Sequence, residues 1–251
     1  MSAAEVFWAN LPLGHGVELI RRDTNGLAAF NKPAGVLSHP NQRGDEKRAL
    51  VTARYVEDGE FFEWGEAAAP QRLWLLNRLD AATSGVILVA TTAKLAGAIR
   101  AHFKHKLVRK VYRTLVFGHP RLPAEIWRDR LAVEKRGGQI RTATDTGHIP
   151  AECAMKVISK SRGEPRLALL QLEPRTGRSH QLRVQCAKRN LPIVGDQTYG
   201  DFPRNREWAK RAGTKRLFLH SLETTFDYEF QGRKHTFAAR APVPAEFEKF
   251  L

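Results

Sequence analysis

Hydrophobic and polar positions alternate along most of this chain in short blocks that have the period of β-strands. Residues 27–30 (LAAF) are apolar and lead into NKPAGVLSHP, where Lys-Pro and Gly predict that a strand ends in a loop. Residues 107–118 (LVRKVYRTLVFG) alternate as a strand does, which places Lys110 and Tyr112 on one face of a strand. Residues 166–174 (RLALLQLEP) have the pattern of a buried strand.

Two segments have helical periodicity instead. Apolar residues from 94 to 103 recur at spacings of three and four, which predicts an amphipathic helix that packs against the sheet. Residues 179–190 (SHQLRVQCAKRN) predict a second helix, with Ser179 as its N-cap.

The remaining long segments have the composition of loops. Residues 118–150 are rich in Gly, Pro and charge, and we expect loops and short edge strands that join two lobes. Residues 56–66 are acidic and are expected to form a solvated loop. No regular strand–helix alternation and no internal repeat is visible.

These patterns favour an α+β fold with a mixed, largely antiparallel central sheet flanked by helices. We expect a single domain over residues 1–251, in which residues 1–26 are an N-terminal extension. A chain of this length with 42% hydrophobic residues can bury a substantial core.

Charge changes the picture from a generic domain to a partner of a polyanion. The chain of 251 residues has 41 Lys and Arg against 26 Asp and Glu, a formal net charge of +15. Such an excess favours nucleic acid, because cationic side chains that neutralise phosphates release counterions. The basic residues are spread through globular sequence, which argues against a membrane-surface helix. Because no signal or membrane-spanning segment is visible, we expect a cytoplasmic protein, and a monomer is the default.

The most unusual apolar stretch is WLLNRLDAATSGVILVA, residues 74–90, which places Arg78 and Asp80 between two hydrophobic blocks. A polar turn in which Asp80 forms an Asx turn would explain this pattern. A lone carboxylate in a basic, apolar pocket can also act as a nucleophile or a base. Burial favours the neutral acid, so that role requires a nearby cation. Arg78 is close in sequence, and Arg183 is a distant candidate.

Other catalytic classes lack their motifs. The sequence contains no phosphate-binding G-x-x-x-x-G-K-[ST], no dinucleotide G-x-G-x-x-G after a strand, no H-E-x-x-H and no G-x-S-x-G. Metal-dependent cleavage requires clustered carboxylates, which Asp80 lacks in sequence. Cys153 and Cys186 are far apart and have no zinc-site spacing, so reduced thiols are expected. We predict neither a metal nor a cofactor.

Two further segments suit RNA. Residues 100–113 contain six Lys or Arg, two His and no acid, together with Phe103 and Tyr112. Cations that follow a backbone and rings that stack on bases are typical of RNA binding, although a solvated helix face fits this segment equally well.

The second segment is the turn before the second predicted helix. Arg175 and Arg178 lie at the positive end of the helix dipole, so an anion is expected nearby, either a phosphate or a carboxylate. A basic surface helix with Glu173 as local partner is the alternative. His180 and Arg183 share one face of the helix.

Taken together, these motifs resemble the RluA-type RNA pseudouridine synthases. NRLDAATSGVILVA is similar to that family's H-R-L-D-x-x-T-S-G motif, and RKVYRTLV resembles its K-x-Y strand. EPRTGRSHQLRVQCAKRNLPIVGDQTYG resembles its T-G-R-x-H-Q-[IL]-R segment and the continuation of that segment. NKPAGVLSHP and RLFLHS resemble the early and late motifs, so the resemblance extends from about Leu27 to the C-terminus.

The resemblance implies that a uridine in a structured ribosomal or transfer RNA stem-loop is isomerised to pseudouridine without a cofactor. It makes Asp80 the nucleophile or base, Arg183 its partner, and Tyr112 a residue that stacks on the flipped base and takes the C5 proton. Arg78 would fill the space that the base leaves, and Leu219 would form an apolar wall. The remaining RNA-binding candidates are Lys110, Arg175, Arg178, His180 and Gln181.

The chain departs from the family pattern at Asn77, where histidine is usual, so a proton-carrying role there is in doubt. The first motif begins by about residue 27, which leaves no room for a separate RNA-binding domain before it. Two other functions stay open. A non-catalytic RNA-binding or ribosome-assembly protein would use Asp80 structurally, and an RNA hydrolase would cleave the chain.

Overall fold

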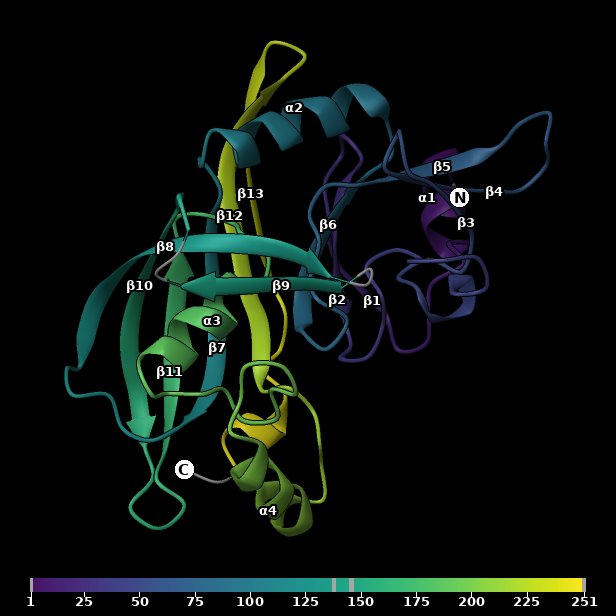
Figure 1. The fold of residues 1–251 in the computed structure, drawn as a ribbon. Helices are drawn as coiled ribbons and strands as arrows, with labels where there is room; N and C mark the ends of the chain where they lie inside the picture. The colour runs from purple at the N-terminus through teal and green to yellow at the C-terminus, as the bar shows by residue number, and fades with distance from the viewer. Residues whose placement is uncertain (1, 137–138, 145–146, 250–251) are drawn as a thin grey trace. The chain divides into compact units, whose positions relative to one another are not determined.

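A computed structural model describes residues 2–136, 139–144 and 147–249 (Figure 1). The fold is α+β, as predicted, and neighbouring strands within each unit pair largely antiparallel. The chain forms two compact units. Unit 1 contains residues 1–107 and 226–241, and unit 2 contains residues 108–225 and 242–251. The chain therefore passes between units at the start of the alternating 107–118 segment and in the C-terminal region, not within residues 118–150 as expected.

Unit 1 is built around β6, which is buried along its whole length. β2 pairs with it from Leu27↔Ala90 to Lys32↔Gly85, and β5 pairs with its end. β1 pairs with β2, so the predicted N-terminal extension contributes a strand to this sheet. The elements of unit 1 are α1 (Ala3–Ala9), β1 (Glu18–Arg22), β2 (Leu27–Lys32), η1 (Glu46–Arg48), β3 (Arg54–Val56), β4 (Phe61–Trp64), β5 (Gln71–Leu75), β6 (Ser84–Ala90), α2 (Ala93–Lys104) and β13 (Arg233–Arg240).

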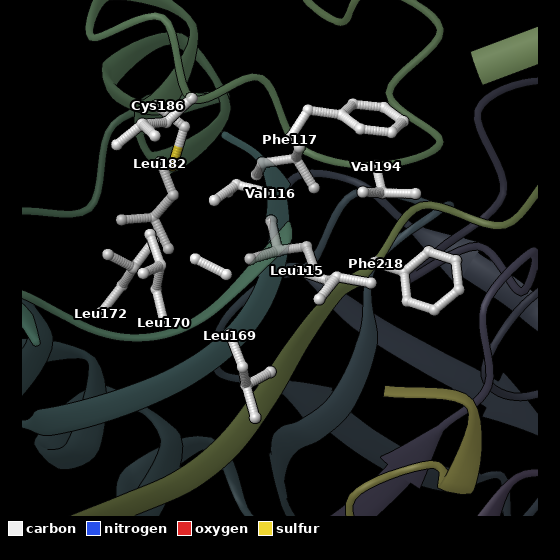
Figure 2. Close-up of a cluster of buried hydrophobic side chains, with 14 of the residues drawn as sticks. Leu115, Val116, Phe117, Leu169, Leu170, Leu172, Leu182, Cys186, Val194 and Phe218 are labelled. Carbon is white, nitrogen blue, oxygen red and sulfur yellow. The ribbon is translucent and has the colours of Figure 1, made fainter. Parts of the chain in front are cut away.

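Unit 2 contains the strand order β12-β7-β11-β10-β8-β9. Its core includes apolar side chains from β7, β11 and α3 together with the segments around Val194 and Phe218 (Figure 2). Trp127 of β8, Met155 of β10 and Trp208 of α4 belong to the same cluster. Its elements are β7 (Arg109–Phe117), β8 (Ala124–Arg136), β9 (Gln139–Thr144), β10 (Ile149–Lys160), β11 (Leu167–Pro174), α3 (Gln181–Lys188), α4 (Phe202–Ala212) and η2 (Ala245–Phe247), and β12 (Leu219–Phe230) continues from this unit into unit 1.

Several predicted elements are confirmed. The helix at 94–103 is α2, which buries Leu95 and Ile99, and its N-cap Thr92 accepts a hydrogen bond from the Leu95 N–H. The strands expected at 27–30, 107–118 and 166–174 are β2, β7 and β11. Cys153 and Cys186 are buried free thiols, and burial raises the pKa of the Cys153 thiol to about 12.

The prediction of loops and short strands over residues 118–150 is wrong. β8 and β10 are long strands that pair with each other, with Trp127 opposite Cys153. Alternate residues of β8 face the interior, where Trp127 and Leu131 are 1% and 0% exposed and Asp129 between them is 8% exposed. Asp129 accepts hydrogen bonds from Gln185 and Arg189 at 2.7 and 2.9 Å. A charged residue inside the strand concealed its alternation in the sequence.

The acidic segment 56–66 is likewise only partly a loop. It contains β4, in which Phe62 is fully buried opposite Leu73 of β5. Glu57, Asp58 and Glu60 occupy the turn before this strand, and Glu66 follows it. The half-buried Glu63 lies within the strand, so the apolar residues between the acids are free to pack.

Candidate active site

The segment between β5 and β6 carries Asp80, and its start is fixed by β6. The Leu76 N–H donates to the carbonyl of Leu88 at 3.0 Å. The Leu88 N–H in turn donates to Oδ1 of Asn77 at 2.8 Å. Because Leu88 is fully buried, this bond satisfies a donor that has no access to water. Asn77, the departure from the family motif, therefore anchors the segment, and its amide does not titrate.

The middle of the segment is held by the loop that follows β2. Ser38 Oγ donates to the Leu79 carbonyl at 2.7 Å, and the Leu79 N–H donates back to Ser38 Oγ at 2.9 Å. The Gly35 N–H donates to the Ala81 carbonyl at 2.8 Å. The residues on both sides of Asp80 are thus bonded to the NKPAGVLSHP loop.

Lys32, at the end of β2, completes this bracing and was not a candidate from the sequence. Its side chain is fully buried, and Nζ donates to the carbonyls of Pro33, Val36 and Ala81 at 3.1, 2.6 and 3.0 Å. Burial lowers the pKa of Lys32 to about 7, and the charge of Asp80 opposes that shift. A cation therefore lies within electrostatic reach of the Asp80 carboxylate. Lys-Pro in the sequence indicated only a turn.

Asp80 itself is half-buried, and its turn is closed by a backbone bond from the Thr83 N–H to the Asp80 carbonyl at 3.0 Å. The turn expected at this position is thus present. Arg78, two residues earlier, has an exposed side chain. Its charge acts on Tyr55, although burial dominates there and raises the pKa of the phenol to about 12.

Tyr112 and Lys110 lie on β7 in unit 2. Tyr112 is opposite Leu172 of β11 and Ser221 of β12. Burial lowers the pKa of Lys110, and the nearby Cys153 opposes this shift. A side chain added at Gly177 would lie 3.5 Å from Lys110 Nζ, so the turn after β11 approaches this lysine.

The turn after β11 is held by buried polar groups. Gln181 is 3% exposed, and its Oε1 accepts from Thr176 Oγ1 at 2.7 Å and from the Arg178 N–H at 3.2 Å. Its Nε2 donates to the Glu152 carbonyl at 3.2 Å and to Gln185 Oε1 at 3.1 Å. All these partners are protein groups, so Gln181 shapes the turn that presents Arg178 to solvent.

An anion was expected near Arg175, and the carboxylate of Glu152 from another strand lies there. Arg175 Nη1 donates to Glu152 Oε1 at 2.6 Å, and Glu152 also accepts from Arg128 Nε at 3.2 Å. Glu173, the alternative local partner, instead accepts from Arg109 Nε at 3.1 Å. Glu152 lies on β10, and only the pairing of β10 with β11 brings it to this turn.

The start of α3 differs from the prediction. Its N-cap is His180, not Ser179, and His180 has a left-handed backbone with φ of 55° and makes no side-chain capping bond. The Ser179 carbonyl accepts from Thr142 Oγ1 at 2.9 Å. His180 Nδ1 bonds to the Tyr199 hydroxyl at 2.8 Å, a tertiary contact that accompanies the unusual backbone.

Arg183 lies on the same face as His180, as predicted, and its guanidinium carbon is 5.1 Å from the centre of the Tyr199 ring. Its Nε and Nη2 donate to Oδ2 and Oδ1 of Asp196, both at 2.8 Å. Burial opposes ionisation of Asp196, but the hydrogen bonds and charge of Arg183 outweigh it and hold its pKa below the usual range. This two-bond geometry fixes the plane of the guanidinium.

The predicted residues fall into two groups. Arg78 and Asp80 belong to unit 1, whereas Lys110, Tyr112, Arg175, Arg178, His180, Gln181, Arg183 and Leu219 belong to unit 2. Leu219 is buried on β12 opposite Thr114. The structure places each group within its own unit, and the pairing of Asp80 with Arg183 stays a prediction. Within the described ranges, no cluster of three or more His, Cys, Asp or Glu side chains has metal-binding geometry, and no helix is long and apolar enough to cross a membrane.

Comparisons of this chain with known proteins all point to one family. A family model described as RNA pseudouridylate synthase matches residues 26–188. A Dual-specificity RNA pseudouridine synthase RluA of Escherichia coli O157:H7 is 34% identical over 224 residues, covering 88% of this chain and 90% of that protein. A tRNA pseudouridine synthase C of Yersinia pestis is 29% identical over 238 residues, covering 91% of this chain and 88% of the relative.

The length covered differs among relatives. A tRNA pseudouridine synthase C of Pectobacterium carotovorum subsp. carotovorum is also 29% identical over 238 residues, but this chain spans only 60% of its length. Among solved structures, Human RNA Pseudouridylate Synthase Domain Containing 1 has a TM-score of 0.67 at 20% identity, covering 90% of this chain and 83% of that one. That likeness supports the fold alone.

Proposed function

The chain belongs to the RNA pseudouridylate synthase family, and we propose on that basis that it isomerises a uridine of structured ribosomal or transfer RNA to pseudouridine. The C1′–N1 bond breaks, the detached uracil rotates, and a C1′–C5 bond forms; C5 then loses its proton and N1 takes up a proton, so the product is an isomer of uridine. The base must be flipped out of its stem or loop, which costs a few kcal/mol. The printed names of the relatives include both tRNA and dual-specificity enzymes, and these support both RNA classes as candidates.

The observation that carries this proposal is the bracing of Asp80. Hydrogen bonds at Asn77, Leu79 and Ala81 fix the segment on both sides of the carboxylate. A fixed carboxylate is already positioned for reaction, and Lys32 lies within electrostatic reach of it. Asp80 then acts at the ribose, either as a nucleophile on C1′ or as a base that promotes a glycal. Alternatively, it acts at the base, as a nucleophile on C6 of the uracil ring.

The remaining residues are assigned by the family resemblance, with support from their local geometry. Arg183 pairs with Asp80 during the reaction, and its bonds to Asp196 hold the guanidinium plane for that contact. Tyr112 stacks on the flipped base and accepts the C5 proton. Arg78, exposed beside the braced turn, occupies the space that the base leaves, and Leu219 forms part of the apolar wall.

The RNA-binding candidates divide by exposure. Arg175 and Arg178 are exposed and contact phosphates in this proposal. Lys110 and His180 are half-buried; Lys110 approaches Gly177 of the same turn, and His180 bonds to the Tyr199 hydroxyl. Gln181 supports RNA binding from beneath, because its amide is engaged by protein groups.

The direct test is release of tritium from RNA that carries 5-³H-uridine, in transcripts of ribosomal and transfer RNA. Asp80→Asn keeps the shape of the side chain and removes its charge. We expect turnover to fall by about 10²-fold or more, whereas RNA affinity is maintained. Asp58→Asn is the matched control, since Asp58 is an exposed acid of the same unit, and it should leave turnover unchanged.

Each alternative function gives a different result. Retained turnover in Asp80→Asn would exclude Asp80 as the reacting group. RNA binding by the wild-type protein without tritium release from any transcript would favour a non-catalytic RNA-binding protein. Shortened RNA on a denaturing gel would identify a hydrolase. A pseudouridine map of ribosomal and transfer RNA, from cells with and without the gene, would then identify the substrate position.

A further inference from the structure

Unit 2 contains a basic pocket that is separate from the turn after β11 and from the exposed residues of the proposed site. It has a volume of about 670 Å³, and its lining residues come from the β10–β11 hairpin, α4 and the segment near the C-terminus. The strands β10 and β11 and the helix α4 are labelled in Figure 1. Its floor includes Trp208 and Leu167, which are 3% and 2% exposed. Four cationic side chains line it against the single carboxylate of Glu164: Lys160, Arg162, Arg211 and Lys249.

Two cations of the basic pocket are held by neutral acceptors. Arg211 Nη1 donates to the backbone carbonyl of Glu164 at 2.7 Å, and Lys160 Nζ donates to the Pro120 carbonyl at 3.2 Å. Across the ranges that the structure describes, no carboxylate lies within ion-pair distance of Lys160, Arg162 or Arg211. Arg109 and Arg175 elsewhere in this unit do have carboxylate partners. Two of the pocket's cations are therefore oriented while their charge is not neutralised.

The outer face of α4 extends this positive surface. The helix contains four basic residues and one acid, and Arg206 and Lys210 are exposed. Its apolar side is used internally, because Trp208 packs edge-on against Phe117 and Phe218 with ring centres 6.3 and 5.8 Å apart. A helix that binds in a membrane interface needs an available apolar face. α4 offers cations instead, which suits phosphates in water.

We infer that the basic pocket binds phosphates of the substrate RNA backbone, as a second contact outside the Asp80 segment. Several cations around one hollow concentrate positive charge that can neutralise backbone phosphates, and such binding releases counterions. The contact is independent of base sequence, since phosphates position an RNA without specifying it. This inference rests on the proposed function for the identity of the RNA, but not for the chemistry of the pocket.

The test removes three pocket charges in Lys160→Ala/Arg162→Ala/Arg211→Ala. The control, Arg21→Ala/Arg233→Ala/Lys234→Ala, removes the same charge from exposed positions of unit 1. The affinity of a substrate stem-loop transcript is measured over a series of salt concentrations for both variants and the wild type. Each lost phosphate contact should lower the slope of log Kd against log salt by about one. We expect a decrease of about two to three for the pocket variant and less than one for the control.

Kinetics and a small-anion arm separate the outcomes. The KM of the pocket variant should be at least about 10-fold higher than that of the control variant, whereas its kcat should change little. Arg162→Glu alone, at an exposed position of the β10–β11 hairpin, should shift the slope in the same direction if the triple variant folds poorly. Equal salt slopes for the pocket and control variants would overturn the inference. In that case, tritium release by the wild type would show that the proposed function still holds. The inference would also be overturned if inorganic phosphate protected Arg162 from chemical modification while the pocket variant left the salt slope of RNA binding unchanged. That result would favour a pocket for small anions.

Discussion

Burial of Lys32 predicts a specific dependence of stability on pH. The pKa of this lysine is lowered from 10.5 to about 7 in the folded protein, and the side chain is 0% exposed. Below about pH 7 the lysine is protonated in both states, so its contribution is constant. Above that pH the folded protein releases the proton while the unfolded chain keeps it up to about 10.5. The unfolded state then binds more protons, and stability rises with pH.

The slope from this single group reaches about 1.4 kcal/mol per pH unit. Between about pH 7 and pH 9.5, Lys32 should therefore add on the order of 3 kcal/mol to the free energy of unfolding. Urea unfolding of the wild type and of Lys32→Met over this range measures the effect. The variant should be less stable at every pH, because three carbonyls lose their donor. The gap between the free energies of unfolding of the variant and the wild type should widen as the pH rises. A gap that stays constant with pH would refute the lowered pKa of Lys32.

Three other substitutions test the bracing of the site. Asp196→Ala should destabilise the protein by about 3–5 kcal/mol in chemical unfolding, because Arg183 stays buried without this partner; a loss below about 1 kcal/mol would show that the pair contributes little. Asn77→Ala should lose about 1–3 kcal/mol, since the buried Leu88 N–H loses its acceptor, whereas Asn77→Asp supplies an oxygen and should recover part of it. Tyr112→Phe should bind RNA as the wild type does and release tritium at least about 10²-fold more slowly; equal rates would remove the hydroxyl from proton transfer.

Local patterns in the sequence were sufficient for several of the regular elements. β2, β7, β11 and α2 follow from hydrophobic periodicity, since each buries its apolar face within a short stretch of chain. The turn at Asp80 also follows from the order of residues. The long strand β8 was missed because Asp129 interrupts its apolar face, and only Gln185, Lys188 and Arg189 make a buried carboxylate tolerable there.

The sequence by itself determined the positive charge, the α+β class and the family motifs with their candidate residues. Only the tertiary structure decided which polar groups meet: Asp196 with Arg183, Glu152 with Arg175, and Lys32 with the carbonyl of Ala81. These partners are 13, 23 and 49 residues apart in the chain. The periodicity of a segment records which side chains leave water, whereas the partner of a buried charge depends on chain segments that only folding brings together.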